Sequence, residues 1–168
     1  MTNIIEDKLK QLNIKLDEVS KPAGSYVPYV VSNNLVFISG QLPFIDGAIT
    51  IKGKVDKDVS INDGIKMAEV CAKALLSQLK AACNGDLDKV IRVVKLGGFV
   101  ASSPDFTDHP KIINGASDRL SEVKFNGWMF ASSPALSALE DSVYDISILS
   151  CTNDDKHSKE TSSLNSNE

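Results

Sequence analysis

INDGIKMAEVCAKALLSQLKAA, residues 61–82, predicts the clearest helix of this chain. Apolar residues recur in it at alternating steps of four and three, which draws one continuous stripe: Ile61, Ile65, Ala68, Ala72, Leu75, Leu79 and Ala82. Ser60 is a suitable N-cap, Asp63 faces the positive end of the helix, and Asn84-Gly85 supplies the stop. The small alanines on the stripe indicate close packing against a sheet.

The residues after this helix predict a strand and a second helix. A β-branched run from Val90 to Leu96, continued by Phe99-Val100, is typical of a strand. Gly97-Gly98 inside it indicates a bulge or a close approach of the backbone to another segment. Pro110 then opens a second helix, with core spacing at Ile112, Ile113, Ala116, Leu120 and Val123.

The residues before the helix at 61–82 predict a hairpin. Tyr26–Val31 and Leu35–Ile38 are β-rich runs on either side of Asn33-Asn34. The chain is expected to change direction at Gly40 and Pro43, because proline cannot donate to a ladder.

Two shorter elements complete this part of the chain. A third strand, Ala48–Ile51, is expected after the Asp46-Gly47 turn, and residues 4–12 have the spacing of a short amphipathic helix.

The order of these elements predicts an α+β fold, a mixed sheet with two long helices packed on one face. Two more strands are needed after Val123, and Val143–Leu149 has β-like texture. Large apolar residues on the uncovered face favour a partner there. We expect residues 1–151 to form a single domain and the polar residues 152–168 to form a disordered tail.

The composition argues against several functional classes. A net charge of −4 and the lack of basic runs disfavour nucleic-acid binding. Three scattered cysteines and two histidines cannot supply four metal ligands at sensible spacing, and a cysteine nucleophile with His109 as its base has no supporting spacing. No signal-peptide pattern and no stretch of about 18 apolar residues occurs, so we expect a cytoplasmic protein without a membrane span.

Several blocks occur in a fixed order along residues 5–123: Gly24–Pro28, Leu35–Pro43, Asp86–Val90, Val93–Leu96, Phe99–Ser102, Pro104–Asp108 and Pro110–Ser117. Together they resemble the RidA/YjgF/UK114 family, in its subgroup labelled endoribonuclease L-PSP or chorismate mutase-like. The resemblance implies the YjgF-like fold of the small trimeric chorismate mutase and a homotrimer that binds a small carboxylate metabolite between subunits. It also implies hydrolysis of enamines and imines such as 2-aminoacrylate to a 2-keto acid and ammonia, with no cofactor and no metal.

In the family's scheme an arginine grips the substrate carboxylate, a tyrosine and backbone groups line the cleft, and a glutamate positions the attacking water. The resemblance places these substrate-binding and catalytic positions at Tyr26, Ser39, Gly40, Gln41 and Asn114. Simpler structural roles compete with each: a packed tyrosine, a bend at Gly40, or a helix asparagine bonded to a neighbouring turn.

The family pattern breaks after about residue 123. When residues 127–140 are aligned without a gap to the family's C-terminal pattern, Ala131 falls at the position of the arginine. Pro134 falls in a central strand, at a position that should donate a backbone hydrogen bond. Asp145 best matches the glutamate. Either the 3′ end of the gene is frameshifted or degraded, or the cleft has been repurposed, and we favour the first interpretation.

Two functions from different classes follow. The first is a RidA-like deaminase, impaired by Ala131; the second is a non-catalytic trimeric module that binds small 2-keto or amino acids. The acidic balance and the lack of a histidine pair disfavour a ribonuclease. Arg92 and Arg119 are expected at solvated surface positions. Lys95 is a candidate cation near the cleft, although its ammonium cannot bind a carboxylate in the bidentate way that a guanidinium does.

Overall fold

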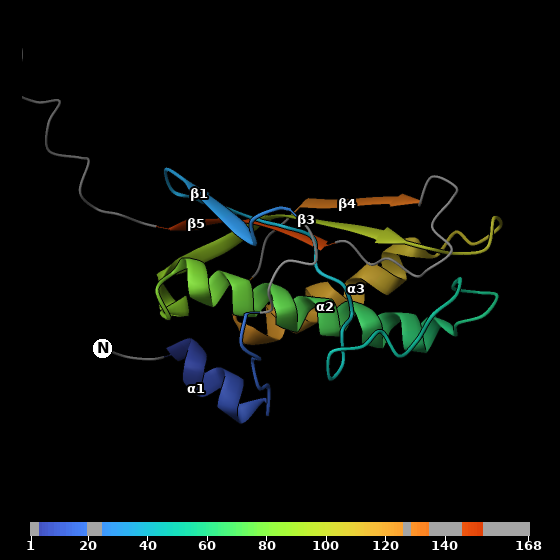
Figure 1. Cartoon of the computed structure of the whole chain (residues 1–168), viewed down its shortest axis with the longest axis horizontal. Helices are drawn as coiled ribbons and strands as arrows, with labels where there is room; N and C mark the ends of the chain where they lie inside the picture. The colour runs from blue at the N-terminus through green and yellow to red at the C-terminus, as the bar shows by residue number, and fades with distance from the viewer. Residues whose placement is uncertain (1–3, 20–24, 126–128, 135–145, 153–168) are drawn as a thin grey trace, which may run out of the picture.

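The computed structural model describes residues 4–19, 25–125, 129–134 and 146–152, the last two ranges by their backbone. Its elements are α1 (Ile4–Gln11), β1 (Tyr29–Ser32), β2 (Leu35–Ile38), α2 (Ile61–Ala82), the 3₁₀ turn η1 (Leu87–Lys89), β3 (Val90–Val100), α3 (His109–Val123), β4 (Met129–Pro134) and β5 (Ile146–Thr152). The strands form one mixed sheet in the order β1-β2-β5-β3-β4, in which only the β3–β4 pair is parallel. Helices α2 and α3 lie on one face of this sheet (Figure 1), so the predicted α+β architecture is confirmed.

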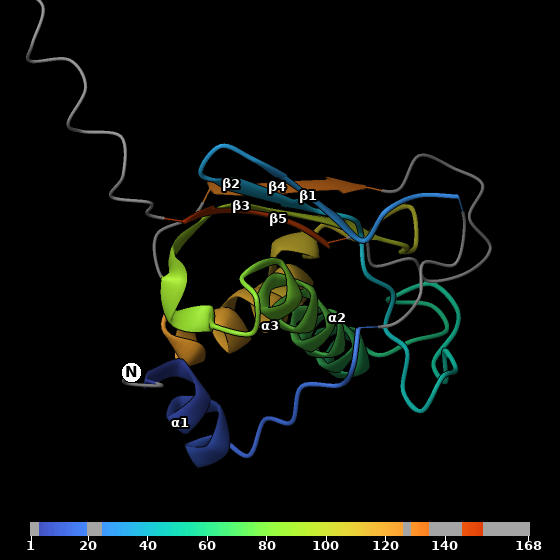
Figure 2. The same ribbon diagram turned by 60° about the vertical axis from the view of Figure 1, so that its left-hand side comes forward.

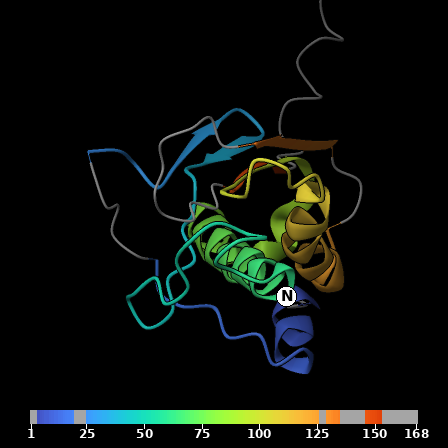
Figure 3. The ribbon, with the colours of Figure 1, turned by 90° about the vertical axis from the view of Figure 1, so that its right-hand side faces the viewer.

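Helix α1 forms a third layer, on the side of α2 and α3 away from the sheet (Figure 2). The view turned by 90° shows the same order of layers (Figure 3). Asp88 of η1 fixes this helix, since its carboxylate accepts hydrogen bonds from the backbone N–H groups of Ile4 and Ile5 at 2.8 and 2.9 Å. A carboxylate at the N-terminus of a helix also faces the positive end of the helix dipole. An ion pair of 2.7 Å between Glu6 and Lys80 adds a second link to α2.

Helix α2 has the bounds that its periodicity predicts. The Ser60 hydroxyl accepts a hydrogen bond from the Asp63 backbone N–H at 3.1 Å and caps the helix. After the helix, Asn84 and Gly85 take positive φ angles of 55° and 86°, as the predicted stop requires. The centre of the predicted stripe is buried, as are both cysteines of this region: Ala68, Cys71, Ala72, Leu75, Leu79 and Cys83.

Two glycines bring α3 close to both of its neighbours. A Cβ atom on Gly115 would lie 2.6 Å from the backbone carbonyl oxygen of Ile65 in α2. A Cβ atom on Gly98 would overlap the Cδ1 atom of Ile113, whose side chain fills the space beneath β3. The close approach predicted at Gly97-Gly98 is therefore confirmed, while the irregularities of strand register fall earlier in β3, before Lys95.

The predicted hairpin is present as β1 and β2, and Asn33 has a φ of 50° in its turn. The predicted strand Ala48–Ile51 is wrong. The Asp46-Gly47 turn forms, but it closes only one isolated bridge, between Ile45 and Ala48. This segment leaves the sheet for the start of α2, so it meets no strand with which to pair.

The end of the chain corrects a second expectation. Strand β4 lies at an edge of the described sheet, and Pro134 is its last residue, in register with Val100. The conflict expected from a proline in a central strand was therefore wrong, because edge strands accept proline. The central position belongs to β5, between β2 and β3. Asp145 and the predicted tail beyond Thr152 lie outside the described residues.

The contact of Gly115 with α2 can be tested by adding one methyl group. In an ordinary helix interior, Gly115→Ala would stabilise by about 1 kcal/mol through helix propensity. Here the methyl group must displace the Ile65 backbone, so we expect a net loss of about 1–3 kcal/mol in the free energy of unfolding, measured in urea. Asn114→Ala, at the exposed neighbouring position, is the matched control and should cost nothing. A stabilised Gly115→Ala protein would contradict the close approach.

Candidate functional site

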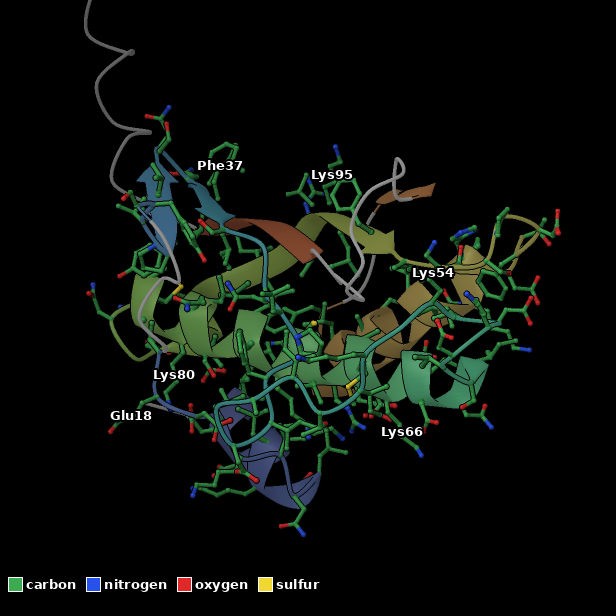
Figure 4. All side chains as sticks on the ribbon, turned by 45° about the vertical axis from the view of Figure 1, so that its right-hand side comes forward. Glu18, Phe37, Lys54, Lys66, Lys80 and Lys95 are labelled. Carbon is green, nitrogen blue, oxygen red and sulfur yellow. The ribbon has the colours of Figure 1, made fainter. Side chains whose placement is uncertain are left out.

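The sheet face away from the helices, here called the open face, carries apolar side chains exposed to solvent. In β3 the buried residues Leu96, Gly98 and Val100 alternate with Lys95, Gly97 and Phe99, which therefore point to the open face. Phe37 of β2 and its partner Val30 of β1 lie on the same face, and Phe37 and Phe99 are 42% and 43% exposed. Figure 4 shows Phe37 and Lys95 rising from the sheet on the side away from α2.

The predicted Ser-Gly-Gln block lies directly after β2 and is ordered by hydrogen bonds. The Ser39 hydroxyl donates to the carbonyl oxygen of Val27 at 2.6 Å. The amide nitrogen of Gln41, a buried residue, donates to the carbonyl oxygens of Ser39 and Gly40 at 2.8 and 3.2 Å. Tyr26 is 49% exposed next to Val27, so it is not the packed tyrosine of the simpler interpretation. These residues form the first group of the candidate site.

Ala131, the position that the resemblance aligns with the family's arginine, lies at the same end of the sheet. With Gly97 it forms the second group of the candidate site. Ala131 pairs in register with Gly97 of β3. Phe37 and Lys95 are both opposite Leu149, so Ser39, two residues beyond Phe37, is level with Gly97. Three strand spacings separate Ser39 from Ala131, which amounts to about 14 Å. One chain thus places the two groups at one end of the sheet without bringing them into contact.

The remaining predicted position in the described residues, Asn114, is exposed on α3. Since α3 covers the other face of the sheet, Asn114 lies in a different layer from Lys95 and Phe99 (Figure 1). Within one chain it does not join either group.

The two arginines have different surroundings. Arg119 donates to Glu69 of α2 at 2.7 Å and to Glu122 at 2.8 Å. The predicted solvated role of Arg119 was therefore wrong, because its guanidinium lies between α3 and α2 and links the two helices. Arg92 is exposed near the start of β3, opposite Cys151 in the register.

The structure also joins two residues that sequence reasoning missed. The Ser102 hydroxyl and His109 Nε2 are 3.0 Å apart, and the rings of His109 and Phe106 form an edge-to-face contact with centroids 5.0 Å apart. Their separation of seven residues across the β3–α3 loop carries no recognised motif. In the described part of the chain no carboxylate is hydrogen-bonded to His109, so the pair orders the loop rather than completing a catalytic triad.

Cys71 within α2 and Cys83 directly after it have the surroundings of unreactive thiols. Cys71 and Cys83 are buried, and burial raises the pKa of the Cys83 thiol, which lowers its thiolate fraction at neutral pH. Within the ranges that the structure covers, no three His, Cys, Asp or Glu residues gather in a way that could hold a metal ion. None of the described helices is long and apolar enough to cross a membrane.

Comparison with known proteins defines the family. The model of the family described as "YjgF/chorismate mutase-like, putative endoribonuclease" matches residues 6–132. TCP17 of Trypanosoma cruzi is 44% identical over 115 residues, which are 68% of this chain and 71% of TCP17. The chain therefore belongs to the YjgF/chorismate mutase-like family.

Solved structures share the fold. Atu1372 of Agrobacterium tumefaciens, a protein of unknown function, is 38% identical, with a TM-score of 0.79 over 90% of this chain and 94% of that one. TdcF of E. coli, solved with bound serine, is 15% identical, with a TM-score of 0.57 over 82% of this chain and 99% of that one. At that identity TdcF shows the fold alone.

The role of Gln41 in the first group can be tested by removing its amide. Gln41→Met keeps the volume but leaves the carbonyl oxygens of Ser39 and Gly40 without their donor, so we expect a loss of about 1–3 kcal/mol in the free energy of unfolding. Gln11→Met makes the same chemical change at an exposed position and should be neutral within about 0.5 kcal/mol. Equal unfolding midpoints for the two variants in urea would show that the amide bonds do not hold the block.

Proposed function

We propose that the chain is a RidA-like hydrolase that converts reactive 2-aminoacrylate-type enamines and imines to 2-keto acids and ammonia, at a rate reduced by Ala131. The observation that carries the proposal is the alignment of the Ser39–Gln41 block, Gly97 and Ala131 at one end of the open face. Family membership supports it. The serine bound by TdcF, a protein of the same fold, fits a ligand with a carboxylate and a nitrogen attached to the same carbon.

The proposal includes assembly into a homotrimer with its clefts between subunits. The first group and Ala131 stand about 14 Å apart in one chain, which is farther than a ligand of three or four carbons reaches. A second copy that closes over the open face would bring one group of each chain together. It would also cover Phe37 and Phe99, whose exposure is costly in a lone protomer. We place this assembly in the cytoplasm, with residues 1–151 as one domain and 152–168 as a tail that begins where Thr152 ends β5.

The proposed reaction needs only water. An enamine first takes up a proton on its terminal carbon and loses one from its nitrogen, which gives an imine. Water then adds to the imine carbon: its oxygen bonds to the carbon as a hydroxyl, and its other proton goes to the nitrogen, which now carries two hydrogens. Transfer of the hydroxyl proton to the nitrogen lets ammonia leave as the C=O bond forms. In our proposal Asp145 positions the water in a general-base role, Tyr26 lines the cleft with its hydroxyl, and the Ser39–Gln41 block contributes backbone groups.

A non-catalytic binding module is the second candidate, and Ala131 is the observation that favours it. Without a guanidinium at this position the site lacks the bidentate grip that would orient a carboxylate for attack. Binding of a small 2-keto or amino acid needs less exact positioning than hydrolysis does.

Release of pyruvate from enzymatically generated 2-aminoacrylate tests the proposal. We expect the natural chain to accelerate it weakly and Ala131→Arg to accelerate it about 10- to 150-fold more, since one charge-assisted bond contributes about 1.5–3 kcal/mol. Ala48→Arg adds the same charge at an exposed turn outside the strands of the sheet and should change nothing.

The outcomes separate the two candidates. Binding of 2-ketobutyrate in calorimetry, with no acceleration by either the natural chain or Ala131→Arg, would establish the binding module instead of the hydrolase. Neither binding nor acceleration would reject both candidates.

A further inference from the structure

We propose that Lys95 provides the cation that binds the substrate carboxylate in this chain, a task that the family assigns to the residue at position 131. This inference rests on the proposed function and names the group that recognises its carboxylate ligands. It starts from the direction of the side chain. Lys95 is exposed and points to the open face, as the alternation along β3 requires and as Figure 4 shows.

The register places Lys95 within reach of the missing guanidinium. Ala131 pairs with Gly97, and Lys95 precedes Gly97 by two residues on the same face of the same strand. Two residues of a strand span about 7 Å, which is comparable to the length of lysine's four-carbon stem. Gly97 has no side chain, so nothing of β3 itself stands between the Lys95 stem and the space beside Ala131.

The Lys95 ammonium is available for a ligand. Other cations are engaged: Lys66 pairs with Asp63, Lys80 with Glu6, and Arg119 with two glutamates. Across the residues whose side chains the structure covers, Lys95 makes no ion pair or hydrogen bond. The open face also carries Phe37 and Phe99, and an apolar face strengthens a charge–charge contact once a second copy excludes water.

The chemistry of an ammonium defines the class of ligand. A guanidinium selects a planar, bidentate carboxylate geometry, whereas lysine is a point charge on a flexible stem. We therefore expect Lys95 to bind small 2-keto, 2-amino and 2-hydroxy monocarboxylates with little preference among them. Phe99, two residues beyond Gly97, offers an apolar surface to their short hydrocarbon end.

Arg92 offers a matched comparison on the same strand. It is exposed and cationic like Lys95, but it precedes Gly97 by five residues, about 16 Å along the strand. Its guanidinium therefore cannot reach the space beside Ala131, although its charge contributes to the same field around the sheet.

Calorimetric titration of the full chain with 2-ketobutyrate, and with its uncharged amide as a second probe, tests the inference. We expect the natural chain to prefer the acid, Lys95→Met to bind it about tenfold more weakly and to lose the preference for acid over amide, and Lys95→Arg to restore both. Arg92→Met should bind the acid within about threefold of the natural chain, because a distant exposed charge contributes little.

Each result has one meaning. If the natural chain and Lys95→Met bind 2-ketobutyrate equally and with the same preference over the amide, Lys95 is not the cation, while the proposed function stands. If the natural chain does not bind 2-ketobutyrate, the inference fails, and the proposed function fails with it only if the chain also does not accelerate the release of pyruvate from 2-aminoacrylate. Should Lys95→Met fold poorly by circular dichroism, Lys95→Gln replaces it, and retention of the preference for the acid in that variant overturns the inference.

Discussion

The fit of α3 between β3 and α2 is the constraint on which the rest of this structure depends. Gly115 lets the helix touch the backbone of α2, and Gly98 gives Ile113 its place under the sheet. Because the first contact is made between two backbones and the second places the Ile113 side chain directly against the backbone of β3, the two long helices share one continuous core with the sheet's inner face. The apolar residues on the outer face of the sheet are not part of this core. The same fit that closes one side thus leaves Phe37 and Phe99 exposed on the other.

Most of the fold could be predicted because its signals are local. The stripe of α2 needs only a period of 3.6 residues, and its ends follow from Ser60 and Asn84-Gly85. The prediction of a strand at Ala48–Ile51 was wrong because a strand forms only beside another strand. The sequence does not show that this segment leaves the sheet. For the same reason the edge position of Pro134 and the central position of β5 could not be predicted, since strand order is set by contacts far apart in the chain.

The candidate site could be predicted only in part. Family blocks located Ser39, Gly40 and Gln41, and the structure shows them ordered at the end of β2. The sequence did not reveal that Arg119 is held between helices, because its partner Glu69 is 50 residues away. Nor could it reveal that Lys95 and Ala131 are neighbours through Gly97, since that relation exists only in the register of two parallel strands.

The contact between Asp88 and α1 has a consequence for the motions of the N-terminal region. The first amides of a helix normally have no acceptor and exchange their hydrogens with solvent quickly. Here those of Ile4 and Ile5 are bonded to a carboxylate 84 and 83 positions away. The exchange of these two amide hydrogens with deuterium is therefore governed by the opening of the segment where η1 meets β3. Two amides near the start of the chain thus report on the stability of a segment in its middle.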